Sequence, residues 1–377
     1  MQILKNKASK ATITFAKKPD ADVIVEENSY EDVDNNNDDN DNNVQAESKE
    51  NSQSETLIEE KKDKNEGVSL MVLGEIMMGG EVTQNLDYNY LMAFRHVYNL
   101  TKKSDFTYTN LSTNITNLDS IEDAKSKYLV NKNILSALNA LGVDAVSIAS
   151  DHIVDFSESV ISNTEKLLEN SSIFVAGKKD MPVYFEKDGK RIAIVSTNSV
   201  ILGTKNVYDK NGISVYDDAN LKKNIEEAKK MSDFVIVDVH WGKGESYFGV
   251  TDLMWQISRY AIDVGADLVM GTHNIGIKPI EIYNGKPIIY TTGYFMSDLE
   301  YEEVKMGYMF DLKFNDEVKL KEIEMTPIYI NDLKETMFFT EYNQADADEN
   351  MANLNYLMNE NGVNSEIKDN KIFVEFN

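Results

Sequence analysis

The sequence predicts an α/β fold in which mixed β-sheets are flanked by helices. Short apolar runs typical of buried strands alternate with stretches whose apolar residues recur three or four positions apart, as on one face of a helix. Two of the helical stretches are followed by a glycine, Gly142 and Gly265, as expected at a helix C-cap. Alternating strands and helices favour a largely parallel or mixed sheet covered by helices.

The expected elements begin at residue 67. Strands are expected at 68–73, 106–110, 144–149, 191–196, 234–239, 267–270 and 287–290. Helices are expected between them at 131–141, 157–170, 220–231 and 252–264. After residue 306 the chain is richer in strands, at 307–314 and 320–330, and it ends in a helix at 347–359 and a strand at 371–376. We therefore expect a main domain over 67–333 and an appended helix and strand over 334–377.

Residues 1–66 are expected to be a disordered tail, first basic and then acidic. Residues 1–18 contain five lysines and no acid, whereas 19–66 contain 17 acidic residues and four lysines. The run at 32–43 has one apolar residue in twelve, too few to offset the entropy lost on ordering. A spacer is the ordinary interpretation of this segment, and cation binding is the alternative.

No targeting segment is visible in this chain. The apolar stretch at 11–16 is shorter than the core of a signal peptide, and no run of about 20 apolar residues could span a membrane. The sequence therefore favours either a cytoplasmic protein or one whose anchor is not part of this chain.

Charge and composition exclude several classes of function. Of the net charge of −26, −18 lies on residues 67–377. A body this acidic repels nucleic-acid backbones and anionic lipid surfaces and attracts cations. Cysteine is absent, so disulfides and thiolate metal sites are excluded.

Three of the four histidines lie just after a predicted strand. These are His152, His240 and His273, whereas His96 lies on a predicted helix and is expected near the surface. Ligands of open α/β sheets bind beyond the carboxyl ends of strands, so the three histidines can converge on one site. A single histidine at a strand end is usually structural, but three in a histidine-poor chain favour a shared site.

Carboxylates accompany these histidines. Glu75 follows the first strand, Asp151 directly precedes His152, and Asp155 lies three residues after it. Imidazole nitrogen combined with carboxylate oxygen suits Zn²⁺, Mn²⁺ or Fe²⁺. The alternative is that these polar groups satisfy one another without a metal.

Six short motifs follow the predicted strands over residues 68–296. They are Gly74-Glu75-Ile76-Met77-Met78-Gly79, Asn110-Leu111-Ser112, Ala149-Ser150-Asp151-His152, His240-Trp241-Gly242, Gly271-Thr272-His273-Asn274-Ile275 and Gly293-Tyr294-Phe295. In order and spacing they resemble the motifs of the CapA/PgsA family of capsule and poly-γ-glutamate biosynthesis proteins. The resemblance implies a metallophosphoesterase-like (calcineurin-like) α/β sandwich.

The sequence departs from the family's motifs at four positions. Glu75 stands in place of an aspartate, Ser112 of a glutamate, Asp151 of an asparagine and Ile275 of a second histidine, while Glu245 follows the His-Trp-Gly motif one residue late. Ile275 cannot bind a metal, and Ser112 is a poor ligand. The departures favour one divalent ion (Mn, Zn or Fe) over two, or a silenced site.

The resemblance also implies roles for individual residues. The metal ligands would be Glu75, Asp151, His240 and His273, with Asn110 as a weaker fifth. His152 would act as general acid or orient a phosphate, and Asp155 would orient His152 by a hydrogen bond.

For the whole protein, the resemblance implies a part in synthesis or export of poly-γ-glutamate or a related surface polymer. The implied partners are a membrane-bound polymer synthase or export complex and the anionic polymer itself, at an extracytoplasmic, cell-surface or membrane-associated location. The alternatives are a metal-dependent phosphoesterase or other hydrolase, and a non-catalytic cell-surface binding module. The helical spacing of Met254, Trp255 and Ile257 predicts that all three belong to the core.

Overall fold

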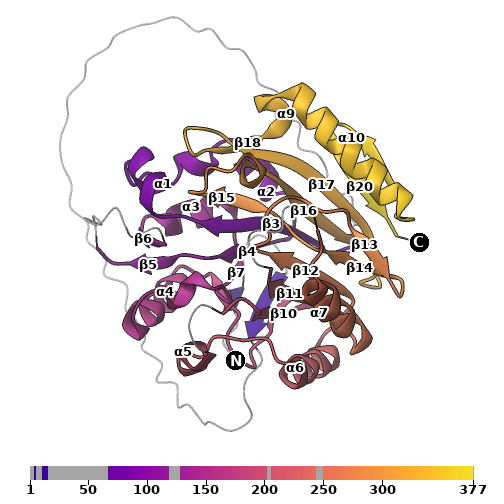
Figure 1. Ribbon diagram of the computed structural model, residues 1–377. Coiled ribbons are helices and arrows are strands. Elements are labelled where there is room, and N and C mark those ends of the chain that lie inside the picture. Colours follow the sequence, from indigo (N-terminus) through magenta and orange to yellow (C-terminus); the bar gives the residue numbers. More distant parts are fainter. Residues whose placement is uncertain are drawn as a thin grey trace, which may run out of the picture. The chain divides into compact units, whose positions relative to one another are not determined.

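Two large mixed β-sheets, each covered by helices, form the part of the chain that contains the predicted strands (Figure 1). The computed structural model describes residues 4–5, 11–15, 67–118, 128–201, 205–242 and 249–376. The short strands β5 (Asn114–Thr116) and β6 (Leu129–Asn131) pair with each other outside the large sheets.

Parallel strands β10, β11, β12 and β14 lie at the centre of the first sheet, which has eight strands in the described chain. In spatial order its strands are β1 (Leu4–Lys5), β2 (Ala11–Phe15), β9 (Val183–Lys187), β10 (Lys190–Asn198), β11 (Phe234–His240), β12 (Leu268–Thr272), β14 (Lys286–Ile289) and β13 (Glu281–Tyr283).

Parallel strands β3, β4, β7 and β8 form one side of the second sheet, which has ten strands in the described chain. In spatial order its strands are β19 (Ser365–Lys368), β20 (Lys371–Glu375), β17 (Leu320–Ile330), β16 (Met306–Phe314), β3 (Ser69–Met77), β4 (Phe106–Leu111), β7 (Ala145–Ser147) and β8 (Phe174–Ala176), with β15 (Tyr294–Ser297) on β3 and β18 (Thr336–Phe338) on β17.

Helices occupy the connections between these strands. They are α1 (Gly80–Asn85), α2 (Tyr98–Thr101), α3 (Ile134–Leu141), α4 (Glu158–Asn170), α5 (Lys205–Lys210), α6 (Asp218–Met231), α7 (Asp252–Asp263), α8 (Glu302–Lys305), α9 (Phe339–Tyr342) and α10 (Gln344–Glu360), with short 3₁₀ turns η1 (Met92–Phe94) and η2 (His152–Val154).

The main core lies between the two sheets. Apolar side chains of both sheets form one buried cluster there, and the rings of Phe106 and Phe185 meet across the interface with centroids 5.0 Å apart. A second cluster lies between the eight-stranded sheet and helices α6 and α7, and a third between the ten-stranded sheet and helices α3 and α4. The layers are therefore helix, sheet, sheet, helix, which confirms the predicted fold class of mixed sheets flanked by helices.

Every strand and helix expected from the sequence is present within a few residues. Within the tail expected over 1–66, the structure describes the short strands β1 and β2, which pair with each other, and β2 also pairs with β9 of the eight-stranded sheet. Apart from β1 and β2, the residues of that segment lie outside the described residues. The sequence expectation for Trp255 was wrong: it is 48% exposed, and its ring stacks against the guanidinium of Arg259 with a separation of 4.2 Å.

Among the described residues, no helix has both the length and the apolar composition needed to cross a membrane.

Candidate metal centre

Strand β11 carries the polar groups of the centre on its inward face. Successive side chains of a strand point to opposite faces. Phe234 and Ile236 pack into the core between the sheets, so Asp238 and His240, two and four residues after Ile236, point the same way. The inward face of this strand therefore changes from apolar to polar at its carboxyl end.

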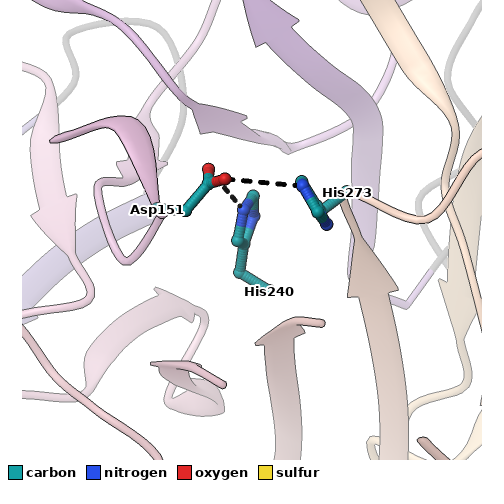
Figure 2. Close-up of side chains that lie close together, drawn as sticks. All are labelled: Asp151, His240 and His273. Carbon is teal, nitrogen blue, oxygen red and sulfur yellow. Dashed lines mark hydrogen bonds and ion pairs between the residues drawn. The ribbon is translucent and has the colours of Figure 1, made fainter. Parts of the chain in front are cut away.

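Asp151, His240 and His273 converge at that end of the sheets (Figure 2). Each offers one ligand atom, and the three atoms lie within 4.8 Å of one another. His240 Nε2 is 3.0 Å from one carboxylate oxygen of Asp151, and His273 Nε2 is 3.5 Å from the other. His240 and Asp151 are buried, while the His273 side chain is 16% exposed.

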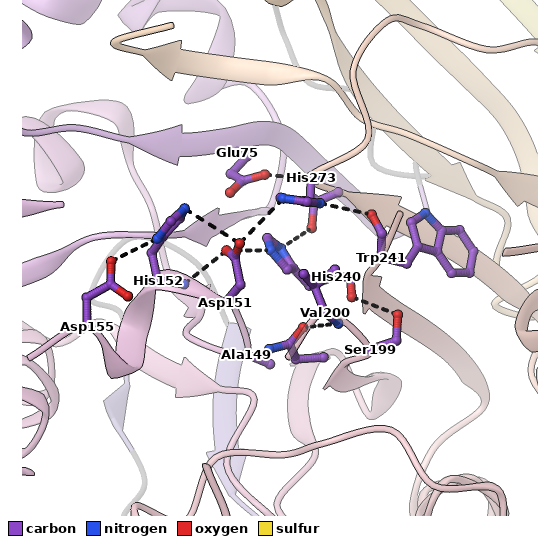
Figure 3. Close-up of polar contacts among 12 residues, drawn as sticks. Glu75, Ala149, Asp151, His152, Asp155, Ser199, Val200, His240, Trp241 and His273 are labelled. Carbon is purple, nitrogen blue, oxygen red and sulfur yellow. Dashed lines mark hydrogen bonds and ion pairs between the residues drawn. The ribbon is translucent and has the colours of Figure 1, made fainter. Parts of the chain in front are cut away.

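His273 is held in a strained backbone conformation. Its φ is +72°, in the left-handed region that non-glycine residues rarely adopt. Its N–H donates to Glu75 Oε2 at 2.9 Å, and its carbonyl accepts from the Tyr294 hydroxyl at 3.2 Å. Its Nδ1 lies 3.3 Å from the carbonyl oxygen of Trp241, so Nε2 faces Asp151 (Figure 3). Such strain persists only where surrounding contacts fix the conformation, as they do here.

Glu75 and Asn110 lie beside this group on neighbouring strands. They are paired in register between β3 and β4, just past an irregularity in the pairing. Both side chains are buried, and Glu75 Oε1 and Asn110 Oδ1 have no hydrogen-bond partner among the described residues. A buried oxygen without a donor is costly, so each is available to a ligand.

His152 and Asp155 form a pair at the rim. His152 Nδ1 lies 2.8 Å from Asp155 Oδ2, and His152 Nε2 lies 3.5 Å from Asp151 Oδ2. The His152 ring also stacks on Tyr128 with centroids 3.6 Å apart. The His152 side chain is 19% exposed and so remains within reach of solvent.

The charges of the centre shift one another's pKa values. Burial raises the pKa of Asp151, but the hydrogen bond and charge of His240 outweigh it and leave that pKa well below its usual range. Burial lowers the pKa of His240, but Glu75 and Asp151 together raise it above its ordinary value. The pKa of His273 is lowered, mainly by burial and secondly by repulsion from the charge of His240. The centre therefore holds an ionised carboxylate beside imidazoles, without a lysine or arginine paired to Asp151 among the described residues.

Asp238 is a buried acid that the sequence analysis missed. It is 1% exposed and accepts hydrogen bonds from the Tyr108 hydroxyl at 2.7 Å, Ser196 Oγ at 2.8 Å and Asn110 Nδ2 at 3.1 Å. Burial raises its pKa, and these donors oppose the shift. The signal was an acid inside an apolar strand, two residues before His240 and therefore on the same face.

The donor set fits a divalent transition metal. One carboxylate and two imidazoles converge, and Glu75 adds a buried oxygen without a donor. Nitrogen and oxygen ligands of this kind suit Zn²⁺, Mn²⁺ or Fe²⁺. A bound ion would act as a Lewis acid and lower the pKa of a coordinated water.

Two of the positions that depart from the family's motifs, Ser112 and Ile275, do not join this group. Ile275 packs against the apolar cluster on the helix side of the ten-stranded sheet, and the Ser112 hydroxyl is buried without a partner among the described residues. Trp241 is fully buried, and its indole N–H donates to the Tyr290 carbonyl at 2.9 Å. Glu245 lies outside the described residues.

Residues 69–299 match the model of the family described as bacterial capsule synthesis protein PGA_cap. The chain is 28% identical over 286 residues to the PGA biosynthesis protein CapA of Bacillus subtilis (strain 168), covering 70% of this chain and 72% of that one. It is 26% identical to the capsule biosynthesis protein CapA of Bacillus anthracis, covering 64% of this chain and 62% of that one. A probable polyglutamine synthesis accessory protein of Mycobacterium tuberculosis is 26% identical, covering 52% of this chain and 57% of that one.

Solved structures that resemble the chain include two 5'-nucleotidases. A putative 5'-nucleotidase from Staphylococcus aureus aligns at a TM-score of 0.42 with 13% identity, covering 72% of this chain and 54% of that one. A 5'-nucleotidase precursor from Thermus thermophilus aligns at a TM-score of 0.40 with 12% identity, covering 76% of this chain and 59% of that one.

Proposed function

The chain belongs to the bacterial capsule synthesis protein PGA_cap family, and we propose that it takes part in the synthesis or export of poly-γ-glutamate or a related surface polymer. The proposal is supported by relatives named for PGA and capsule biosynthesis and by one named as a polyglutamine synthesis accessory protein. Its partner would be a membrane-bound synthase or export complex, at an extracytoplasmic or membrane-associated location.

The metal centre is the proposed functional site. The convergence of Asp151, His240 and His273 within 4.8 Å is the observation that carries this proposal. These three residues would hold one divalent ion of Mn, Zn or Fe, and Glu75 would complete its ligands. Asn110 would be a weaker fifth ligand. One ion is favoured over two because Ile275 stands where the resemblance expects a second histidine.

A cation at this site would also help an acidic protein to meet an anionic polymer. The net charge of −18 on residues 67–377 repels a polyanion. A metal held by Asp151 would supply local positive charge that neighbouring side chains lack, since Asp151 has only histidines as charged partners among the described residues.

The second candidate is a metal-dependent phosphoesterase or related hydrolase. The contact of His152 with Asp155 at 2.8 Å favours it, because a carboxylate that fixes an imidazole is typical of a general acid or of a phosphate-orienting group. A non-catalytic cell-surface binding module is the third candidate, and it would use the same site without turnover.

A genetic complementation experiment tests the proposed role. The gene is deleted from its own host, and surface polymer is measured after complementation with the wild-type chain, Asp151→Ala or His96→Ala. We expect wild type and His96→Ala to restore the polymer and Asp151→Ala to fail at equal protein level. Unchanged polymer after deletion would contradict the capsule role.

A turnover assay separates the candidates. The full chain, loaded with Mn²⁺ or Zn²⁺, is incubated with phosphomonoesters and phosphodiesters, alongside the variant His152→Ala. Hydrolysis that His152→Ala abolishes would favour the phosphoesterase. Absence of turnover together with restored polymer in the complementation experiment would favour the accessory role.

A further inference from the structure

The metal centre is built from two half-sites, one on each sheet. Glu75, Asn110 and Asp151 come from strands of the ten-stranded sheet or the loop after β7, and His240 and His273 come from the carboxyl ends of β11 and β12 in the eight-stranded sheet. The distances between ligand atoms therefore depend on how the two sheets are placed against each other.

A polar bridge crosses between the sheets directly beneath the centre. Asp238 of the eight-stranded sheet accepts from Tyr108 and Asn110 of the ten-stranded sheet, at 2.7 and 3.1 Å. Ser196, beside Asp238 in register, donates to Asp238 at 2.8 Å and lies 2.6 Å from Ser147 across the interface. The layer below these groups is apolar. Among the contacts between the two sheets, this bridge is therefore the polar layer that lies next to the metal ligands.

The same bridge fixes the orientation of the Asn110 amide. Nδ2 lies 3.1 and 3.2 Å from the two oxygens of the Asp238 carboxylate. A carboxylate only accepts hydrogen bonds, so the amide nitrogen must face it and the amide oxygen must point away. That oxygen is buried without a partner among the described residues and lies on the strand position paired with Glu75.

We propose that Asp238 is a positioning residue of the metal centre: it joins the two half-sites and turns the Asn110 amide oxygen out as a metal ligand. The inference rests on the proposed metal site. Asp238 is not among the residues whose ligand atoms converge, and it already accepts from Tyr108, Ser196 and Asn110, so we assign it no direct contact with the ion. Its effect on the metal passes through Asn110.

A double-mutant cycle on the full chain tests this route. The dissociation constant for Mn²⁺ is measured by titration calorimetry for wild type, Asp238→Asn, Asn110→Ala and the double variant. We expect Asp238→Asn to weaken binding by about 10- to 100-fold, as loss of a partner of a metal ligand commonly does. In the Asn110→Ala background the same change should alter binding by no more than about twofold, because coupled residues are not additive.

Asp267→Asn is the matched control, since Asp267 is a buried acid of the same sheet at the opposite end of the strands. It should leave Mn²⁺ affinity unchanged. Additive losses in the cycle, or wild-type affinity in Asp238→Asn, would overturn the inference alone. Absence of binding in wild type would overturn the metal centre and the inference with it.

A swap of the two side chains covers the case in which Asp238→Asn does not fold. The variant Asp238→Asn with Asn110→Asp keeps an amide-to-carboxylate hydrogen bond between the sheets and still leaves an oxygen facing away from residue 238. We expect it to bind Mn²⁺ at least as tightly as wild type. A folded swap variant that does not bind would contradict the proposal.

Discussion

The two ends of the parallel strands use acidic residues in opposite ways. At the amino ends, an aspartate directly precedes each of four strands and accepts the backbone N–H of the neighbouring strand. These pairs are Asp105 with Ser69 at 3.0 Å, Asp144 with Thr107 at 2.9 Å, Asp233 with Arg191 at 2.8 Å, and Asp267 with Val235 at 2.9 Å. Each fixes the start of one strand against the next.

At the carboxyl ends, Asp151 and Glu75 also accept backbone N–H groups, from His152 and His273, but neither has a lysine or arginine partner among the described residues. Asp267 has Lys229 and Lys286 at 2.6 and 2.8 Å, whereas Asp151 has only histidines as charged partners among the described residues. Glu75 keeps one buried oxygen without a donor there. An acid whose partners are complete therefore supports the fold, while a buried acid with an incomplete set of donors indicates a ligand site.

The largest expected effect is stabilisation of the fold by a bound metal ion, which only the residues at the carboxyl ends of the strands would bind. An ion that binds the folded state but not the unfolded state stabilises the fold by about 2.7 kcal/mol when its free concentration is 100 times its dissociation constant. We expect Mn²⁺ or Zn²⁺ to raise the melting temperature of wild type and of Asp267→Asn, but not of His273→Ala. A shift retained in His273→Ala would show that the ion binds elsewhere.

A smaller effect is expected from Asp267→Asn without metal. The change removes a charge paired with Lys229 and Lys286, both partly exposed, so we expect a loss of about 2 kcal/mol of unfolding free energy. Chemical denaturation measures it. A loss smaller than that of Asp233→Asn would contradict the structural role of the buried aspartate.

The pH dependence of stability should have opposite signs for two aspartates that flank β7. Burial raises the pKa of Asp144 to about 6, so its stabilising contribution is present below about pH 4 and is lost as the pH rises through about 6. Relative to Asp144→Asn, metal-free wild type should lose about 2 kcal/mol between pH 4 and pH 7.

The pKa of Asp151 is instead lowered, so its contribution is present above about pH 4 and is lost on further acidification. Denaturation of wild type and Asp151→Asn between pH 3 and pH 5 in chelator measures this difference. Parallel pH curves for the Asp144 and Asp151 variants would contradict the distinction between the two ends.

The smallest effect is expected at Asp233, which is exposed. Asparagine can still accept the Arg191 N–H through its side-chain oxygen, so Asp233→Asn should cost about 0.5 kcal/mol or less. Denaturation curves of Asp233→Asn and Asp267→Asn, measured side by side, show whether burial sets the strength of this repeated contact.

Much of this organisation is visible in the sequence, because local patterns specify it. The segments at 141–152 and 264–273 share a plan of glycine, aspartate, strand and a loop with histidine. The structure gives this plan a physical reason: Asp144 and Asp267 each fix the start of a strand, and His152 and His273 follow its end. Periodicity likewise placed the strands and helices, since burial of one face imposes it.

What the sequence did not predict depends on contacts between distant segments. Asp238 was hidden in a nearly continuous apolar strand, and its donors come from the other sheet and from Ser196 on the neighbouring strand. Strand β9 was not predicted, although the pair Asp188-Gly189 is typical of a tight hairpin turn. In the structure these two residues have φ values of 52° and 79° and connect β9 to β10. Trp255 was assigned to the core because helical spacing does not tell which face a large side chain occupies.

The most direct test of the account is the metal content of the full chain, measured by mass spectrometry after exposure to Mn²⁺ or Zn²⁺ and removal of free ion. We expect one ion per chain in wild type and in Asp267→Asn, and none in Asp151→Ala or His240→Ala. A metal-free wild type, or equal metal in wild type and Asp151→Ala, would contradict it.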